Sequence, residues 1–331
     1  EIISDITKRM GEGMAEFIPK EVVTTKEYET YCYYVAGLVG VGLSQLYAKS
    51  GLESDAMLQY NCMGTLADSM GQFLQQTNII RDYLEDIEEL PAPRMFWPRD
   101  IWSRYAPNGK LEDFKDPAHQ KEALQCLNHM VSNALHHVPA CLEYMKLCKD
   151  PKVFAFTAIP QVMAIATLAL CYNNHNVFTG VVKIRKGLAA KLTVSTKNMQ
   201  DVYTIFREFS LELVSKVRPH ENPGSAQATM KAVAEIERIC TEGLKEEIGA
   251  TVKTEDQLSP TAEQPIDLGT RILLWLMFFG YFCYAWKLFG LRESLGVATP
   301  ETFNRLDIMQ MVVSLLAMAF VSKLCITGQK V

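Results

Sequence analysis

The chain lacks the patterns that mark several common classes of metal-binding, redox and nucleic-acid-binding proteins. Its nine cysteines occur singly and form no CxxC pair, which favours reduced thiols in a cytosol-facing protein over a disulfide scaffold. No HExxH motif is present and no GxGxxG motif follows a strand, so neither a zinc-protease site nor a Rossmann domain is predicted. Basic residues are not in excess: 33 Lys and Arg face 38 Asp and Glu, and the net charge of −5 argues against nucleic-acid binding.

Alternating strand patterns are also nearly absent, whereas apolar residues recur at helical spacing along most of the chain. We therefore predict an all-α domain over residues 1–218. Its expected helices cover residues 1–18, 26–48, 56–87, 119–148, 152–173, 177–190 and 197–217. Because the chain opens at Glu1, inside a helical pattern and without a methionine or signal peptide, we expect a fragment of a longer protein. A processed chain and an artefact are the alternatives.

The composition changes after the helical domain. A short amphipathic helix is expected near residues 226–248, and residues 251–270 are polar with few large apolar groups. We predict that residues 219–270 form a short helix and a flexible tether.

Two apolar stretches follow and predict a membrane anchor over residues 271–331. Residues 272–291 are long enough, at about 1.5 Å per residue, to cross a hydrocarbon core of about 30 Å. A buried core helix is the alternative, which the position after a polar tether disfavours. Residues 308–326 contain Gln310 and Lys323, and they form either a second span or an interfacial helix.

A stripe of polar side chains crosses the helix expected over residues 56–87. The stripe consists of Gln75, Asn78, Asp82 and Asp86. At about 100° per residue, these positions fall within an arc of about 80°. Asp82 and Asp86 lie four residues apart, so their carboxylates are neighbours whose repulsion a divalent cation would remove. We predict a Mg²⁺ site, for which a solvated acidic face is the alternative.

Three residues beside that acidic pair suit the same chemistry. Gln75 and Asn78 carry amides that can orient carboxylates or metal-bound water. Arg81 adds a fixed cation for a phosphate group.

Four segments, taken in order, resemble sequence blocks of the squalene synthase family. They are Tyr31–Gly40, Phe73–Asp86, Ala158–Thr167 and Val182–Gly187. The acidic helix alone would also fit the related phytoene synthases, whereas the ordered set is specific. The resemblance implies an isoprenoid-synthase-type helical bundle around an apolar channel, with a C-terminal transmembrane helix or helices.

The resemblance also implies a two-step reaction, the first committed step of sterol biosynthesis. Two molecules of farnesyl diphosphate condense head to head to presqualene diphosphate, which NADPH then reduces, after rearrangement, to squalene. The implied cofactors are Mg²⁺, or Mn²⁺, and NADPH. We expect a monomer in contact with the lipid bilayer, at the endoplasmic reticulum membrane, with its catalytic domain facing the cytosol.

Individual roles follow from the same resemblance. Asp82 and Asp86 correspond to a metal-binding pair. Gln75 and Asn78 correspond to its polar neighbours. Tyr31 corresponds to the tyrosine of the first half-reaction, which aids ionisation or proton removal.

The remaining roles concern the carbocation and the phosphates. Phe154 and Phe156 stand where the family places a cation-shielding aromatic ring, and we favour Phe156. Arg81, Lys183 and Arg185 correspond to groups that bind the phosphates of NADPH or the diphosphate. Taken alone, Tyr31 and both phenylalanines are more typical of core packing, and the basic stretch of a solvated face.

Two further features have structural interpretations. Gly37, Gly40 and Gly42 interrupt an apolar helix, which indicates either close helix packing or room for a prenyl chain. His136 and His137 lie in an amphipathic pattern, and we expect a structural role for them.

The sequence departs from the family at one point. The family carries an earlier aspartate-rich motif of DxxED type, and no aspartate cluster here replaces it. The predicted metal site is therefore half represented. We expect these 331 residues alone to be inactive or poorly folded.

Three other functions stay open. A phytoene-type synthase would share the acidic helix and stop before the reductive step. A non-catalytic, membrane-tethered helical scaffold derived from the synthase would need neither metal nor NADPH. A soluble helical interaction domain is disfavoured by the apolar residues 272–291.

Overall fold

Helices make up the regular structure of every segment that can be described, and no strand occurs in those segments. The computed structural model describes residues 1–60, 63–89, 93–218 and 223–257. The first half contains α1 (Ile2–Glu16), α2 (Thr25–Cys32), the π-helical turn η1 (Tyr33–Gly37), α3 (Leu38–Lys49), the 3₁₀ turn η2 (Asp55–Tyr60), α4 (Leu66–Arg81), α5 (Tyr83–Ile87) and α6 (Arg99–Trp102). The second half contains the 3₁₀ turns η3 (Leu111–Lys115) and η4 (Pro117–His119), then α7 (Gln120–Leu135), α8 (Val138–Leu147), α9 (Pro151–Cys171), α10 (Asn176–Thr179), α11 (Lys186–Ser195), α12 (Met199–Ser215) and α13 (Pro223–Gln257). The predicted all-α class is confirmed.

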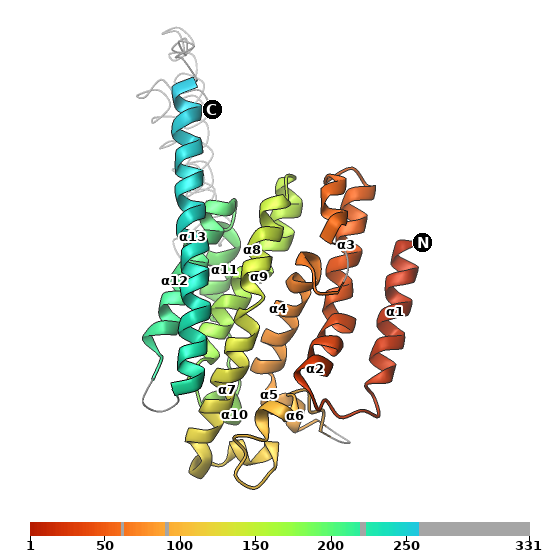
Figure 1. Ribbon diagram of the computed structural model, residues 1–331, viewed down its shortest axis with the longest axis vertical. Coiled ribbons are helices and arrows are strands. Elements are labelled where there is room, and N and C mark those ends of the chain that lie inside the picture. Colours follow the sequence, from red (N-terminus) through yellow and green to blue (C-terminus); the bar gives the residue numbers. More distant parts are fainter. Residues whose placement is uncertain (61–62, 90–92, 219–222, 258–331) are drawn as a thin grey trace, which may run out of the picture. The chain divides into compact units, whose positions relative to one another are not determined.

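Helix α4 is the centre of the bundle, because it packs against η1, α3, α7, α8 and α9. Figure 1 shows α1, α3 and α4 side by side, with α9 beyond α4. This placement explains why eleven of the sixteen residues of α4 are buried. The remaining positions, which include Gln75, Asn78 and Arg81, are half-buried or exposed.

Glycines allow α4 and the segment before it to approach closely. A Cβ added at Gly71 would lie 2.2 Å from the carbonyl oxygen of Ala36, and one at Gly40 would lie 2.1 Å from that of Ala67. A Cβ added at Gly42 would lie 3.0 Å from the Ile6 side chain of α1, a tight contact with a side chain rather than with the backbone. The helix-packing interpretation of the glycines is confirmed, and these positions leave no room for a prenyl chain.

Four expected helices are interrupted. The helix over residues 119–148 breaks at His136 and His137, between α7 and α8. The helix over residues 26–48 contains the π turn at η1, and the helix over residues 56–87 breaks between α4 and α5. The helix expected over residues 177–190 was wrong in its middle, because residues 181–185 form no helix between α10 and α11.

The helical unit also extends past the boundary predicted at Arg218, and it runs compactly from Glu1 to Val252. Helix α13 belongs to it, because Thr229 Oγ1 lies 2.7 Å from Ser132 Oγ and 3.1 Å from the Tyr172 hydroxyl. Helix α13 continues to Gln257, so the first residues of the predicted tether are helical. Contacts between segments far apart in the sequence therefore set the end of the helical unit. The change in composition after Arg218 carries no sign of these contacts.

The predicted membrane segments, residues 272–291 and 308–326, lie outside the described residues. Within the described residues, α9 alone is long and apolar enough to cross a membrane. It is 67% buried inside the bundle, where it packs against α4 and α12, as expected of a core helix.

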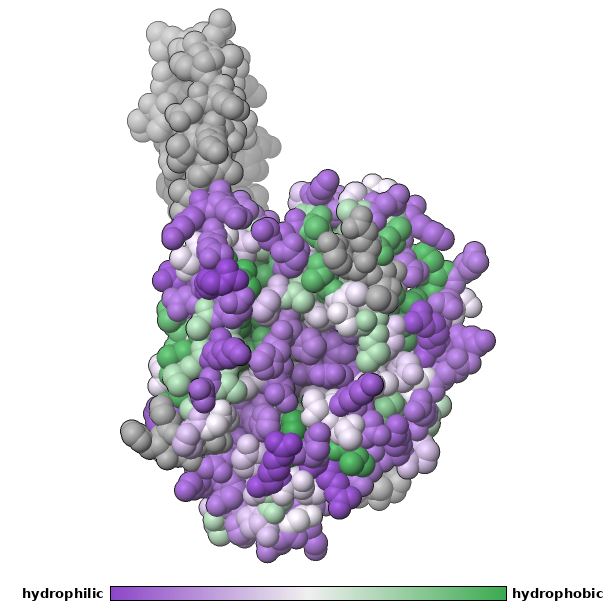
Figure 2. Space-filling model, in the orientation of Figure 1, coloured by the Kyte–Doolittle hydropathy of each residue, from purple (hydrophilic) through white to green (hydrophobic). Residues whose placement is uncertain are grey.

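Figure 2 shows that the face seen in Figure 1 is largely hydrophilic, with hydrophobic side chains gathered in separate patches. The His137 side chain is half-buried and bonded to Gln76, which agrees with the structural role expected for it, whereas His136 is exposed.

Candidate active site

The acidic stripe crosses a break of one residue. Asp82 ends α4 and precedes α5, with φ −91° and ψ 14°. The Trp97 indole N–H donates to the carbonyl of Ile79 at 3.1 Å, and this insertion into the helix ladder accounts for the break. The bonds from Asp82 N to Asn78 O (2.8 Å) and from Asp86 N to Asp82 O (2.9 Å) still keep the stripe on one side.

Arg81 and Asp82 form a two-point ion pair within this break. Arg81 Nε lies 2.7 Å from Asp82 Oδ1, and Nη2 lies 2.6 Å from Oδ2. The two side chains are 27% and 23% exposed, so water screens the pair only partly. The ion pair raises the pKa of Arg81 further, which keeps the guanidinium charged.

Asp86, one turn later, is half-buried. Burial raises the pKa of its carboxyl to about 7, an effect that the charge of Arg94 opposes and that of Asp82 increases. A bound cation would reverse the burial effect, because it would replace the water that the carboxylate has lost.

Tyr31 approaches the acidic helix from α2. Its ring stacks on Phe96 with centroids 4.5 Å apart, and Phe17 lies edge-on at 5.4 Å. Burial raises the pKa of Tyr31 to about 12, and the nearby charges of Arg94 and Asp86 also act on it. The tertiary structure therefore brings Tyr31 and Asp86 into one electrostatic environment, although 55 positions (86 − 31) separate them.

The loop before α6 supplies two residues that the sequence analysis missed. The guanidinium of Arg94 lies 5.7 Å from the centre of the Phe96 ring, which in turn stacks on Tyr31. The backbone N–H of Arg94 also donates to the backbone carbonyl of Asp86, at 2.9 Å. Helical periodicity could not identify these residues, because a proline-rich loop carries them.

The two phenylalanines of α9 have opposite environments. Phe154 is 6% exposed and belongs to the core, whereas Phe156 is 62% exposed. An exposed, apolar position is available to a ligand. Of the two rings, only that of Phe156 is accessible to a ligand, as its expected role requires. The role itself stays a prediction.

The basic segment lies next to the acidic helix. Lys183 Nζ lies 3.7 Å from Glu85 Oε1, a pair that is exposed and therefore weak. Arg185 is exposed at the last residue before α11, where helix N–H groups and the helix dipole favour anions.

The residues present fit part of a Mg²⁺ site. Asp82 and Asp86 supply two hard oxygen donors, and Mg²⁺ commonly uses one or two carboxylates together with phosphate oxygens and water. In the described residues, no group of three or more His, Cys, Asp or Glu side chains is arranged to hold a metal. The pair thus suits a metal that a substrate diphosphate helps to hold.

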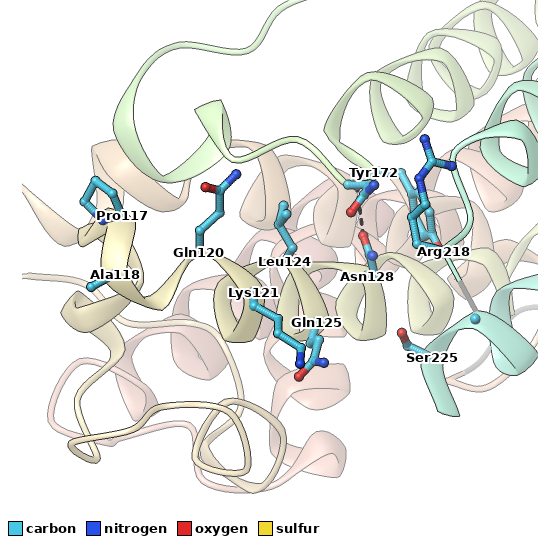
Figure 3. Close-up of a pocket in the computed structure, with 12 residues that line it drawn as sticks. Pro117, Ala118, Gln120, Lys121, Leu124, Gln125, Asn128, Tyr172, Arg218 and Ser225 are labelled. Carbon is cyan, nitrogen blue, oxygen red and sulfur yellow. Dashed lines mark hydrogen bonds between the residues drawn. The ribbon is translucent and has the colours of Figure 1, made fainter. Parts of the chain in front are cut away.

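A separate cavity of about 520 Å³ lies between η4, α7 and the start of α13 (Figure 3). Its lining includes Lys121, Asn128 and Arg218 and shares no residue with the candidate site. The cavity is therefore separate from the candidate site.

Comparison with known proteins places these features in a family. The sequence model of the squalene/phytoene synthases matches residues 1–187, more than half of the chain. The chain belongs to the squalene/phytoene synthase family. Its isoprenoid-synthase-type helical fold agrees with this membership.

The relatives of this family member include several named squalene synthases. Squalene synthase LSS of Botryococcus braunii is 48% identical over 293 residues, which are 88% of this chain and 61% of the relative. Squalene synthase 3 of Panax ginseng is 56% identical over 240 residues, 72% of this chain and 55% of the relative. The Solanum lycopersicum squalene synthase is 51% identical over 280 residues, 84% of this chain and 66% of the relative. The chain therefore spans 55–66% of these curated relatives.

A solved structure confirms the fold. TcSQS in complex with the ligand E5700 superposes with a TM-score of 0.69 at 42% identity, covering 73% of this chain and 68% of the other.

Proposed function

We propose that the protein condenses two farnesyl diphosphates head to head to presqualene diphosphate and then reduces that product with NADPH to squalene. Membership of the family and relatives named squalene synthases support the proposal. The observation that carries it is the stacking of Tyr31 on Phe96, which also lies against Arg94, the residue whose backbone N–H donates to the carbonyl of Asp86.

In this proposal, Asp82 and Asp86 hold Mg²⁺, which would offset the negative charge of the departing diphosphate. Gln75 and Asn78 lie on the same stripe and orient the carboxylates or bound water. Arg81 already lies against Asp82, and it exchanges this partner for a phosphate oxygen.

Tyr31 acts as a neutral phenol. With a pKa of about 12 it keeps its proton at physiological pH, so it donates a hydrogen bond to the leaving diphosphate as negative charge develops there. The stack on Phe96 fixes the direction of that donor.

Phe156 stabilises the carbocation. Its ring is exposed on α9 together with Pro160, and Ile159 and Met163 continue the apolar stripe. An aromatic face gives a nearby cation about 0.5–2 kcal/mol, and an apolar surface excludes water that would trap it.

Lys183 and Arg185 bind the phosphates of NADPH. Both side chains are exposed, and the weak Lys183–Glu85 pair leaves the ammonium available. Arg185 has an extended backbone at the residue before α11, which presents its charge next to a helix N-terminus.

Product analysis tests the proposal. The protein encoded by the whole gene and the 331-residue chain are each incubated with farnesyl diphosphate and Mg²⁺, with and without NADPH. From the protein encoded by the whole gene, we expect presqualene diphosphate without NADPH and squalene with NADPH. A product unaffected by NADPH would instead indicate a phytoene-type synthase, which the family model also includes.

Absence of turnover under every condition would favour the non-catalytic scaffold. Full turnover by the 331 residues alone would contradict the expectation that they are inactive.

We also propose that the protein is a monomer anchored at the endoplasmic reticulum membrane, with the helical unit in the cytosol. The apolar residues 272–291 support this. Carbonate extraction of membranes tests it: retention is expected, and release into the soluble fraction would contradict an anchor.

A further inference from the structure

A ladder of buried polar side chains follows α4 beside the acidic stripe. Asp68, Gln72 and Gln76 occur at four-residue spacing and are 3%, 2% and 2% exposed. Gln76 Nε2 donates to Gln72 Oε1 at 3.2 Å, and Gln72 Nε2 donates to Asp68 Oδ1 at 3.2 Å. Burying such groups is costly unless they are bonded, so the ladder needs its partners.

Both ends of the ladder have partners. At one end, His137 Nε2 lies 3.0 Å from Gln76 Nε2 and therefore accepts, which agrees with a neutral ring whose pKa burial lowers to about 4. At the other end, Asp68 Oδ2 accepts the N–H of Gly64 at 2.8 Å.

One bond of the ladder reaches a different element. Gln72 Nε2 donates to the backbone carbonyl of Glu29 at 2.8 Å. The N–H of Tyr33 donates to this same carbonyl, at the position where α2 widens into the π turn η1. A π turn weakens the regular ladder of the helix, so an outside donor at its start helps to fix its geometry.

The π turn touches the ladder a second time at Gly37. A Cβ at Gly37 would lie 2.1 Å from Asp68 Oδ1, so Asp68 packs directly on this backbone. Tyr31 stands two residues after Glu29, in the last turn before η1. Its ring rests on Phe96, while the α2–η1 junction sets the position of its backbone.

We propose that Gln72 is a positioning residue for Tyr31: by holding the Glu29 carbonyl, it fixes the turn that places the phenol ring on Phe96. The use of that phenol in catalysis rests on the proposed function, but the positioning does not. If the ladder only filled the helix interface, then Gln72 and Gln76, which are equally buried, would be interchangeable.

The test compares Gln72→Leu with Gln76→Leu in the protein encoded by the whole gene. Each change removes one buried amide from the ladder, but only the first removes the bond to Glu29. Tyr31 is replaced by 3-fluorotyrosine, so that ¹⁹F NMR reports this ring among the 13 tyrosines. We expect Gln72→Leu to move the resonance and to lower the phenol pKa by at least half a unit, and Gln76→Leu to leave both near the parent values. Equal spectra for the two variants would overturn the proposal.

Gln72→Glu provides the test should Gln72→Leu fail to fold. A protonated glutamic acid can donate to the Glu29 carbonyl, and an ionised one cannot. We expect the parent spectrum at low pH and the displaced one once Glu at position 72 ionises. The unsubstituted chain at each pH corrects for Asp68, Glu29 and Cys32, the titratable neighbours of this region. A spectrum as constant with pH as that of the parent would overturn the proposal.

Kinetics separate positioning from activity. In the active protein, we expect Gln72→Leu to lower kcat of the first half-reaction at least tenfold with the KM for Mg²⁺ unchanged. If Gln72→Leu displaces the ¹⁹F resonance but the parent protein encoded by the whole gene turns over no farnesyl diphosphate, the proposed function is contradicted and the positioning role stands. An unchanged ¹⁹F resonance for Gln72→Leu, when the parent protein is active, would contradict the positioning role and leave the proposed function standing.

Discussion

Arg81 binds the carboxylate of Asp82 through two N–H groups, at 2.7 and 2.6 Å, within the one-residue break between α4 and α5. The pair joins a residue expected to bind phosphate to one expected to bind Mg²⁺. Each ligand therefore competes with the ion pair, and the two ligands together release both partners. This relationship leads to a prediction for each.

We expect Arg81→Met to strengthen the binding of Mg²⁺ alone several-fold, because the Asp82 carboxylate is no longer shared. Binding of inorganic diphosphate in the presence of Mg²⁺ weakens in the same variant, because a cation is lost. Isothermal titration calorimetry measures both. Arg238→Met is the control, since Arg238 pairs with Glu235 and Glu242 on the surface of α13. A loss of Mg²⁺ affinity in Arg81→Met would contradict the competition.

Mg²⁺ affinity is expected to rise with pH up to about 7 and then to level off. The proton must leave Asp86 before the metal binds, and burial raises the pKa of that carboxyl to about 7. Calorimetry from pH 5.5 to 8.5 measures the effect, which is at most about tenfold per pH unit. Glu85→Gln removes an exposed carboxylate from the same turn and should retain the pH dependence. Retention of the dependence in Asp86→Asn would assign the proton to another group.

The same carboxyl affects stability in the metal-free protein. Its folded pKa lies above the ordinary value of 3.8, so the folded state binds the proton more tightly. The free energy of unfolding therefore falls as pH rises from about 4 to about 7. We expect Asp86→Asn to remove this loss, which is of the order of 1 kcal/mol after solvent screening. Urea unfolding at pH 5 and pH 8 measures the change in unfolding free energy between the two pH values. An equal change in the parent and in Asp86→Asn would contradict the assignment to Asp86.

The two phenylalanines of α9 are expected to separate stability from activity. Phe154→Ala removes a core side chain and should cost about 3–5 kcal/mol of unfolding free energy. Phe156→Ala changes a side chain that is 62% exposed, so stability stays within about 1 kcal/mol while turnover of the carbocation step falls. Thermal unfolding and product analysis provide the two measurements. A large stability loss in Phe156→Ala with normal turnover would reverse the assignment.

Gly71→Ala is expected to destabilise the bundle strongly. The new methyl group would lie 2.2 Å from the carbonyl oxygen of Ala36, and backbone atoms cannot move aside without separating α4 from η1. Gly11→Ala in α1 is the matched control, because nothing lies within 4 Å of its added Cβ. That control should gain about 0.5–1 kcal/mol from helix propensity. Similar unfolding midpoints for the two variants would contradict the close packing.

The sequence by itself determined the features that depend on neighbours three or four residues apart. Helical periodicity gave the all-α class, and the i, i+4 spacing of Asp82 and Asp86 gave the acidic pair, because helix geometry alone brings such residues together. The ladder from Asp68 to Gln76 has the same spacing and was readable in principle.

The tertiary structure alone decided which side chains are buried and which charges they feel. It placed Tyr31 on Phe96 and within the electrostatic influence of Asp86, buried Phe154 while exposing Phe156, and added α13 to the bundle. These outcomes depend on contacts between segments that are tens of residues apart. Periodicity identifies the apolar face of a helix, but the helices that pack against that face determine its desolvation and therefore its pKa values.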